Sequence, residues 1–210
     1  MNQLKLLQNV SLVITNVKED KDILRQLSKL SYDLKAIESA EKLYHLFREL
    51  IMQQEDAHFA AKEMTRTLQD TRQLMQQKYQ KHLSLTRLIF ANDQKAFEEL
   101  GLKGKRMQRM DKWLKQCQRF YYHAAAYAAL FEKYNIPSSE IEEMQALLEQ
   151  VNQLYARQKA AQSQAQVLTQ KKMEVGAALE KWYRKFIKVA RIALEEQPQQ
   201  LEALGVVVKG

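Results

Sequence analysis

Residues 138–196 read SSEIEEMQALLEQVNQLYARQKAAQSQAQVLTQKKMEVGAALEKWYRKFIKVARIALEE and contain no residue that stops a helix. Their apolar residues recur at alternating steps of three and four, which is the spacing of a coiled-coil seam. Gly176 is the weakest helix former among them, and a single glycine is tolerated inside a long helix. Ser139 and Glu142 have the spacing of a capping box at the start. The pattern predicts one long, continuous helix.

A second stretch, from Leu34 to Ile89, shows the same spacing. Shorter segments with helical spacing precede the two long ones, at about 3–28 and 106–133. The 210 residues include only 5 Gly and 2 Pro, so the turns that strands need are scarce. The sequence therefore predicts an all-α protein, an elongated four-helix-type bundle or coiled coil of two long and two shorter helical segments.

The two halves of the chain repeat each other at an offset of 104 residues. EELGLKGK at 98–105 corresponds to EALGVVVKG at 202–210, and Tyr79 corresponds to Tyr183 without any gap between. We interpret this as an internal duplication of two helical repeat units, 1–104 and 105–210, in one intertwined domain.

The residues at the end of each half are those that typically begin and terminate a short helix. Asp93 is placed to cap such a helix in the first half, and Pro198 to open one in the second. Gly101 and Gly205 then stand where a helix ends in a left-handed residue. The repeated phrase is thus predicted to be structural.

A resemblance to a known family is carried by two stretches of the chain. They are LGLKGKRMQRMDKWLKQCQRFYYHA (100–124) and WYRKFIKVARIALEEQPQQLEALG (182–205). They resemble a family of uncharacterised bacterial proteins built as helical repeats, with the same Leu-Gly, Trp-Leu, Phe-Tyr and Ala-Arg-Ile-Ala-Leu punctuation. Thr86 and Ile89 depart from it in the first half, where the second has Ala190 and Ala193. The resemblance implies the bundle fold and a bacterial source, and it implies no function.

No constellation for catalysis, metal binding or cofactor binding is predicted. Glu55 and His58 form one Glu-x-x-His pair, but the offset places Lys159 and Gln162 where a di-metal bundle needs the second pair. Cys117 has basic neighbours that would favour a reactive thiolate, and we favour a thiol buried in a helix. The sequence therefore predicts a protein that is not an enzyme.

Other conspicuous residues are predicted to be structural. His82 lies on the apolar seam and is expected in the core or at its boundary. Arg87 and Arg191 are expected to stabilise the carboxyl-terminal ends of the long helices through the helix dipole. A group of aromatic residues is expected to pack the second short segment onto a long helix; it comprises Phe120, Tyr121, Tyr122, Tyr127, Phe131 and Tyr134.

Positive charge is concentrated in the connector 101–137. This segment has 8 Lys and Arg against 2 Asp and Glu, in a chain of net charge +8. The cluster consists of Lys103, Lys105, Arg106, Arg109, Lys112, Lys115 and Arg119. Steps of three and four predict that Lys105, Arg109, Lys112, Lys115 and Arg119 share one helix face. Such a stripe suits nucleic acid or an anionic protein or lipid surface, and we favour a solvated face or one paired with acidic groups.

These features predict a structural or interaction protein that binds an unidentified protein partner or itself. The alternative is binding of nucleic acid or an anionic surface through residues 103–119. One cysteine and no recognisable signal peptide indicate a reducing, cytoplasmic location. The sequence contains no run of 18 apolar residues that would span a membrane.

Overall fold

The computed structural model describes residues 2–206, and within that range every regular element is a helix. The chain is 84% helical, which confirms the all-α class and the helical bundle. Residues 207–210, the end of the predicted repeat unit 105–210, lie outside the described residues.

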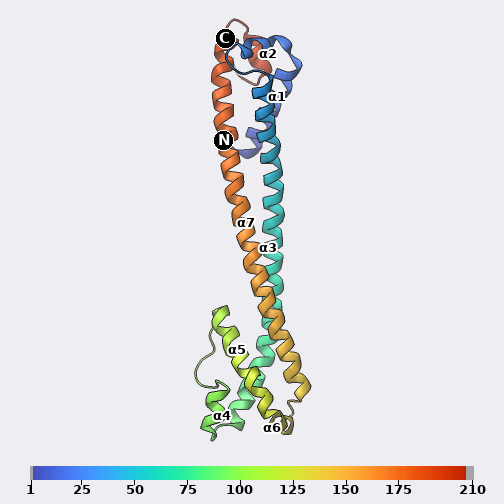
Figure 1. The fold of residues 1–210 in the computed structure, drawn as a ribbon, viewed down its shortest axis with the longest axis vertical. Coiled ribbons are helices and arrows are strands. Elements are labelled where there is room, and N and C mark those ends of the chain that lie inside the picture. Colours follow the sequence, from blue (N-terminus) through green and yellow to red (C-terminus); the bar gives the residue numbers. More distant parts are fainter. Residues whose placement is uncertain (1, 207–210) are drawn as a thin grey trace. The chain divides into compact units, whose positions relative to one another are not determined.

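Two long helices and a set of short ones make up the described chain (Figure 1). In chain order they are α1 (Gln3–Glu19), α2 (Lys21–Ser28), α3 (Leu34–Ile89), α4 (Gln94–Glu99), α5 (Met110–Ala124), the 3₁₀ turn η1 (Ala125–Tyr127), α6 (Ala128–Lys133), α7 (Ser138–Ala193) and α8 (Pro198–Ala203). The long helices α3 and α7 have 56 residues each and are not interrupted, so Gly176 lies inside α7 as predicted.

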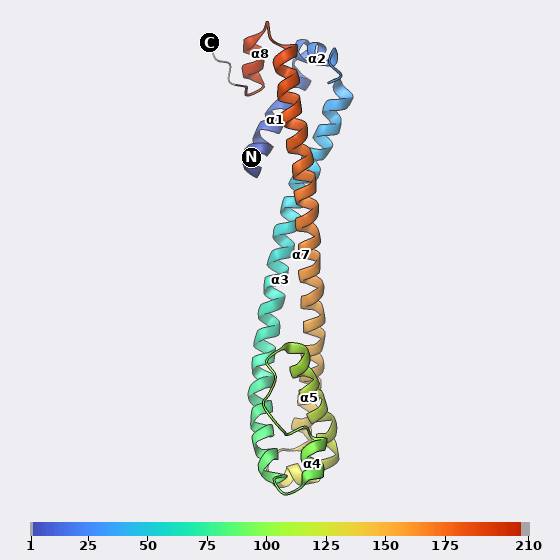
Figure 2. The same ribbon diagram turned by 90° about the vertical axis from the view of Figure 1, so that its left-hand side faces the viewer.

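The chain forms two compact units. The terminal unit comprises residues 1–58 and 163–210, and the central unit comprises residues 59–162. In the terminal unit α1, α2 and α8 gather around the beginning of α3 and the end of α7 (Figure 1). In the central unit α4, α5 and α6 gather around the end of α3 and the beginning of α7 (Figure 2).

Neither compact unit coincides with the predicted repeat unit 1–104 or 105–210. Each compact unit instead combines one half of each repeat, because α3 and α7 run antiparallel in both units. The offset of 104 nevertheless relates the elements, since it carries the bounds of α3 onto those of α7 and those of α4 onto those of α8. It also carries Ser31, which has a φ of 67°, onto Asn135, which has a φ of 59°.

The short helices end as the sequence predicts. Asp93 accepts a hydrogen bond from the backbone N–H of Ala96 at 3.0 Å and caps α4, and Pro198 is the first residue of α8. Gly101 and Gly205 follow with φ of 62° and 74°, angles that a residue without Cβ adopts without strain. The capping box predicted at Ser139 is wrong, since α7 begins at Ser138 and Ser139 lies inside it. The carbonyl oxygen of Pro137 already accepts from the N–H groups of Glu140 and Ile141 at 2.9 and 3.4 Å, so Pro137 takes the capping position.

Each compact unit has its own apolar core. In the terminal unit the buried side chains of α1 and α2 pack with those of α3, α7 and α8, among them Val10, Leu27, Phe47, Leu179, Phe186 and Leu204. In the central unit the core is more aromatic and includes Tyr79, Phe90, Trp113, Phe120, Tyr121 and Phe131. Of the predicted aromatic group, Tyr122 and Tyr134 are exposed, so the prediction of packing is wrong for these two.

Candidate polyanion-binding surface

The basic segment 103–119 is only partly helical. Since α5 begins at Met110, Lys105 and Arg109 precede it, and the prediction that they share one helix face with Lys112, Lys115 and Arg119 is wrong. The physical reason is that the backbone directly before α5 is extended, with a ψ of 127° at Arg109. Its polar groups are bonded to side chains: the N–H of Met107 donates to Gln116 at 2.8 Å, and the carbonyl oxygen of Gln108 accepts from Arg72 at 2.7 Å.

Arg106 holds this irregular segment together. Its Nη1 donates to the hydroxyl of Tyr79 at 3.0 Å. Its Nη2 donates to the carbonyl oxygens of Gly101 at 3.0 Å and of Lys103 at 2.9 Å. The side chain is half-buried. Arg106 therefore supplies hydrogen-bond donors to backbone carbonyls that no helix satisfies, which is a structural role.

Arg109 and Arg119 are also engaged within the central unit. Two N–H groups of Arg109 donate to the carboxylate of Asp111 at 2.6 and 2.5 Å, and this hydrogen bonding lowers the pKa of Asp111 to about 2. Arg119 donates to the carbonyl oxygens of Glu99 at 3.1 Å and of Glu98 at 2.5 Å, at the end of α4. Its charge there is favourably placed against the helix dipole.

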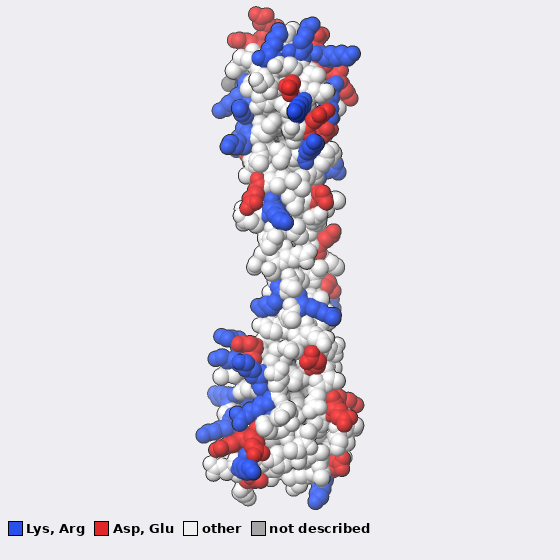
Figure 3. Space-filling view, viewed as in Figure 1, with Lys and Arg blue, Asp and Glu red and all other residues white. Residues whose placement is uncertain are grey.

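The four lysines of the segment remain available. Lys103, Lys105, Lys112 and Lys115 are exposed, and none of their side-chain ammonium groups has a hydrogen-bond or ion-pair partner among residues 2–206. Figure 3 shows Lys and Arg side chains along the edge of the central unit formed by α5 and the segment before it. We call these four residues the lysine patch, and they are what remains of the predicted polyanion-binding cluster.

His82 on α3 is buried, as the sequence predicts, and it has two polar partners that the sequence does not reveal. Its Nδ1 lies 3.1 Å from the hydroxyl of Tyr121 on α5, and its Nε2 lies 3.2 Å from a carboxylate oxygen of Glu140 on α7. A neutral ring donating to Glu140 and accepting from Tyr121 satisfies both contacts. Burial lowers the pKa of His82, and the nearby carboxylate of Glu140 opposes that effect only in part.

Cys117 is fully buried beside this group. Burial raises the pKa of its thiol to about 12, so the thiol stays protonated near neutral pH. Burial raises the pKa of Tyr121 as well. The prediction of a thiol buried in a helix is confirmed, since Cys117 lies in α5 with no exposed surface.

Arg87 lies in the last turn of α3, as the prediction requires, and it makes contacts that the sequence does not reveal. Its Nε and Nη2 donate to the carbonyl oxygen of Leu102 at 2.9 and 2.8 Å, and Nη2 also donates to that of Gly104 at 2.7 Å. Arg87 thus fastens the segment after α4 to the last turn of α3, which is a more specific role than a favourable charge near a helix dipole.

The Glu-x-x-His pair has no metal-site geometry around it. The Nε2 of His58 lies 3.3 Å from the hydroxyl of Thr169. Within residues 2–206 no three His, Cys, Asp or Glu side chains are grouped as metal ligands. The polar contact to Thr169 accounts for the position of the ring in the terminal unit.

Comparison with known proteins adds no assignment. Among the described helices, none combines the length and the apolar character that crossing a membrane requires. The predicted resemblance to bacterial helical-repeat proteins stays a prediction. The chain matches no known protein family, no curated protein and no solved structure.

Proposed function

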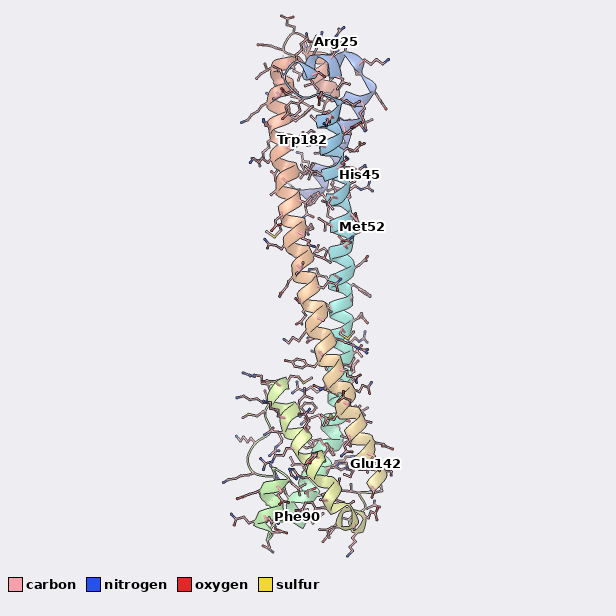
Figure 4. All side chains as sticks on the ribbon, viewed as in Figure 1. Arg25, His45, Met52, Phe90, Glu142 and Trp182 are labelled. Carbon is pink, nitrogen blue, oxygen red and sulfur yellow. The ribbon has the colours of Figure 1, made fainter. Side chains whose placement is uncertain are left out.

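We propose that the protein is a non-enzymatic helical scaffold that binds a protein partner through its long helices. The observation that carries this proposal is the exposure of large apolar side chains on α3 and α7 in the terminal unit. Met52 is 61% exposed and Met173 is 65% exposed. Figure 4 marks the place of Met52 on α3.

The two methionines lie at the same level of the antiparallel pair. The Nζ of Lys172 donates to the side-chain oxygen of Gln54 at 2.9 Å, which fixes the register of the two helices there. The offset of 104 places Ala156 and Gln69 at the equivalent positions of the central unit, so the pair of methionines is not repeated there. Methionine is flexible and polarisable, and it is frequent on surfaces that adapt to a partner.

The test is affinity capture from extracts of the native host with matched variants. We expect a partner that binds the wild type and is lost with M52Q/M173Q. The control L88Q/I192Q removes two other exposed apolar side chains at equivalent positions of the two repeats, and it should retain the partner. Sedimentation velocity on the same three proteins tests self-association. Equal capture and equal sedimentation by all three proteins would refute the proposal.

A second candidate function is binding of a polyanion through the lysine patch. It is favoured by one observation, namely four exposed lysines without acidic partners in the described chain. A polyanion contact releases counterions, so affinity must fall steeply with added salt. The measurement is fluorescence anisotropy with duplex DNA and RNA at several salt concentrations, together with flotation on anionic vesicles.

The variant K103Q/K105Q/K112Q/K115Q should abolish such binding. A control with the same loss of charge, K35Q/K42Q/K62Q/K81Q, removes exposed lysines elsewhere and should keep it. If wild-type affinity at near-physiological salt is no tighter than micromolar, the lysine patch is a solvated face. The cytoplasm is the proposed location, since the lone thiol of Cys117 forms no internal disulfide.

A further inference from the structure

The central unit contains a polar groove between the second half of α3, the segment before α5 and α5 itself. Its volume is about 480 Å³, within the range of small-molecule sites. The residues that line it are Gln69, Arg72, Gln73, Gln76, Gln80, Arg106, Met107, Gln108 and Trp113. Two are cationic, five are amides and none carries a carboxylate.

Arg72 supplies one positive charge of this groove from a half-buried side chain. One of its Nη atoms donates to the carbonyl oxygen of Gln108 at 2.7 Å, and its guanidinium group lies over the ring of Trp113 at 5.1 Å. These contacts fix the plane of the guanidinium and use only part of its donors. No acidic side chain of the described chain pairs with it.

Four glutamines of α3 line the groove on the same side as Arg72. Gln69, Gln73, Gln76 and Gln80 follow one another at steps of four, three and four, so they lie along one face of α3. Gln76 accepts a hydrogen bond from the indole N–H of Trp113 at 2.5 Å. The side chains of Gln69, Gln73 and Gln80 have no partner among residues 2–206, so their N–H donors are available to a ligand.

Arg106 adds a second positive charge and an unsatisfied donor. Its Nε is buried and has no hydrogen-bond acceptor within the described chain, although its two Nη atoms are engaged. A buried donor without an acceptor is uncommon in folded proteins. The groove therefore combines uncompensated positive charge with an excess of donors.

The arrangement of Arg72 with the four glutamines of α3 does not recur at the equivalent positions of the terminal unit. There the offset places Ala177, Glu180 and Arg184 at the positions of Gln73, Gln76 and Gln80. Arg184 donates to the carboxylate of Glu180 at 2.6 Å, so the charge of this arginine is offset within its own helix, and the other cations of that surface are the lysines Lys181, Lys185 and Lys188. Gly176 stands at the position of Arg72.

We propose that the groove of the central unit binds a small oxyanion ligand, a phosphate ester or a carboxylate. The guanidinium of Arg72 is the ionic partner, and the amide groups of Gln69, Gln73 and Gln80 donate further hydrogen bonds. Guanidinium groups suit this role because their planar donors match two oxygens of a phosphate or carboxylate. The site is distinct from the lysine patch, whose residues do not line the groove.

The indole N–H of Trp113 is a reporter inside the site, and Trp182 in the terminal unit is an internal control. The experiment is a ¹⁵N-resolved NMR titration of the full chain with inorganic phosphate, pyrophosphate and citrate, against sodium chloride of equal ionic strength. We expect a saturable shift of Trp113 that sodium chloride does not produce, while Trp182 is unchanged. Pyrophosphate separates phosphate-type ligands from citrate as a carboxylate. No saturable shift with any of the three probes, or equal shifts of both indoles, would overturn the proposal.

Matched variants test the named residues. R72Q should weaken binding of the responding probe at least about tenfold, the usual effect of losing a charge-assisted hydrogen bond. R66Q removes an exposed arginine of the same helix outside the groove and should change affinity less than twofold.

A second test introduces a carboxylate at Gln73, an exposed residue of the groove whose replacement does not disturb the core. Q73E should weaken binding at least about threefold by repulsion, and Q77E, one turn further and outside the lining, should not. Circular dichroism verifies the fold of each variant. Should R72Q fail to fold, unchanged affinity in Q73E overturns the proposal by itself.

Discussion

Phe47 on α3 and Gly176 on α7 approach each other so closely that position 176 has no room for a side chain. A Cβ at Gly176 would lie 2.7 Å from Cε2 and 3.0 Å from Cζ of the Phe47 ring. The ring is buried, so it has little space to move away. In the central unit the equivalent positions hold Val151 and Arg72, a smaller core residue and a long side chain.

G176A should therefore destabilise the protein by about 1–3 kcal/mol through overpacking. Alanine is the better helix former by about 1 kcal/mol, so propensity alone predicts the opposite sign. The measurement is urea unfolding followed by circular dichroism. F47V/G176A should be less destabilised than the sum of its single variants, because the smaller side chain makes room for the new methyl group. Strict additivity would show that the two positions do not interact.

His82 should make stability depend on pH. Its pKa in the folded chain is lower than the ordinary value of 6.5, so the unfolded chain binds the proton more readily. The free energy of unfolding should fall as the pH drops from 6.5 through the lowered pKa of the folded state. The groups that face the ring are Glu140, Tyr121 and Lys78.

The double variant H82F/Y121F removes the imidazole ring that titrates. It also removes the hydroxyl of Tyr121, which would otherwise be left without its contact to His82. The offset places Phe186 and Val17 at these positions in the terminal unit, so an apolar pair fits the fold. The urea midpoint of this variant should change less between pH 7.5 and 5.0 than that of the wild type. H45Q, at an exposed histidine, should keep the wild-type pH dependence. Identical slopes in the wild type and in H82F/Y121F would contradict the prediction.

The substitution G101A should lower the free energy of unfolding by about 1–2 kcal/mol, because alanine must adopt the left-handed backbone of this position. A Cβ there would also lie 3.2 Å from Cδ of Arg119, whereas at Gly104, with a φ of 79°, nothing lies within 4 Å. The comparison of G101A with G104A in urea unfolding isolates the contact from the backbone strain. A loss in G104A as large as in G101A would assign the whole effect to the backbone.

Cys117 should not react with a disulfide reagent such as DTNB in the native protein at pH 8. Its thiol is buried and its pKa is raised to about 12, so both access and thiolate are lacking. In denaturant the single thiol should react at once. Fast labelling of the native protein would contradict the buried position.

Local chemistry explains why most of the fold was predictable. The apolar spacing and the absence of helix stops identified α3 and α7, and the glycines and Asp93 identified the ends of α4 and α8. Each of these signals acts within a few residues of chain. The segment before α5 is mispredicted because lysine and arginine at helical spacing carry no information about the side chains of Arg72 and Gln116, which bond the backbone there.

The candidate sites were less predictable because they depend on contacts between distant residues. Lys103 and Arg106 look alike as charges, yet only Arg106 reaches the hydroxyl of Tyr79 and three backbone carbonyls. The partners of His82 come from two other helices. In the sequence, the glutamines of α3 indicate only a hydrophilic helix face. They form the wall of a groove because the segment before α5 packs beside them in the folded chain.

The division into compact units sets an order of assembly during synthesis. Residues 59–162 form one contiguous stretch, so the central unit has all its core residues once that stretch has left the ribosome. The terminal unit joins residues 1–58 with residues 163–210. The apolar faces of its amino-terminal helices therefore stay uncovered until more than a hundred further residues have been synthesised. These helices are the part of the nascent chain that most needs protection from aggregation.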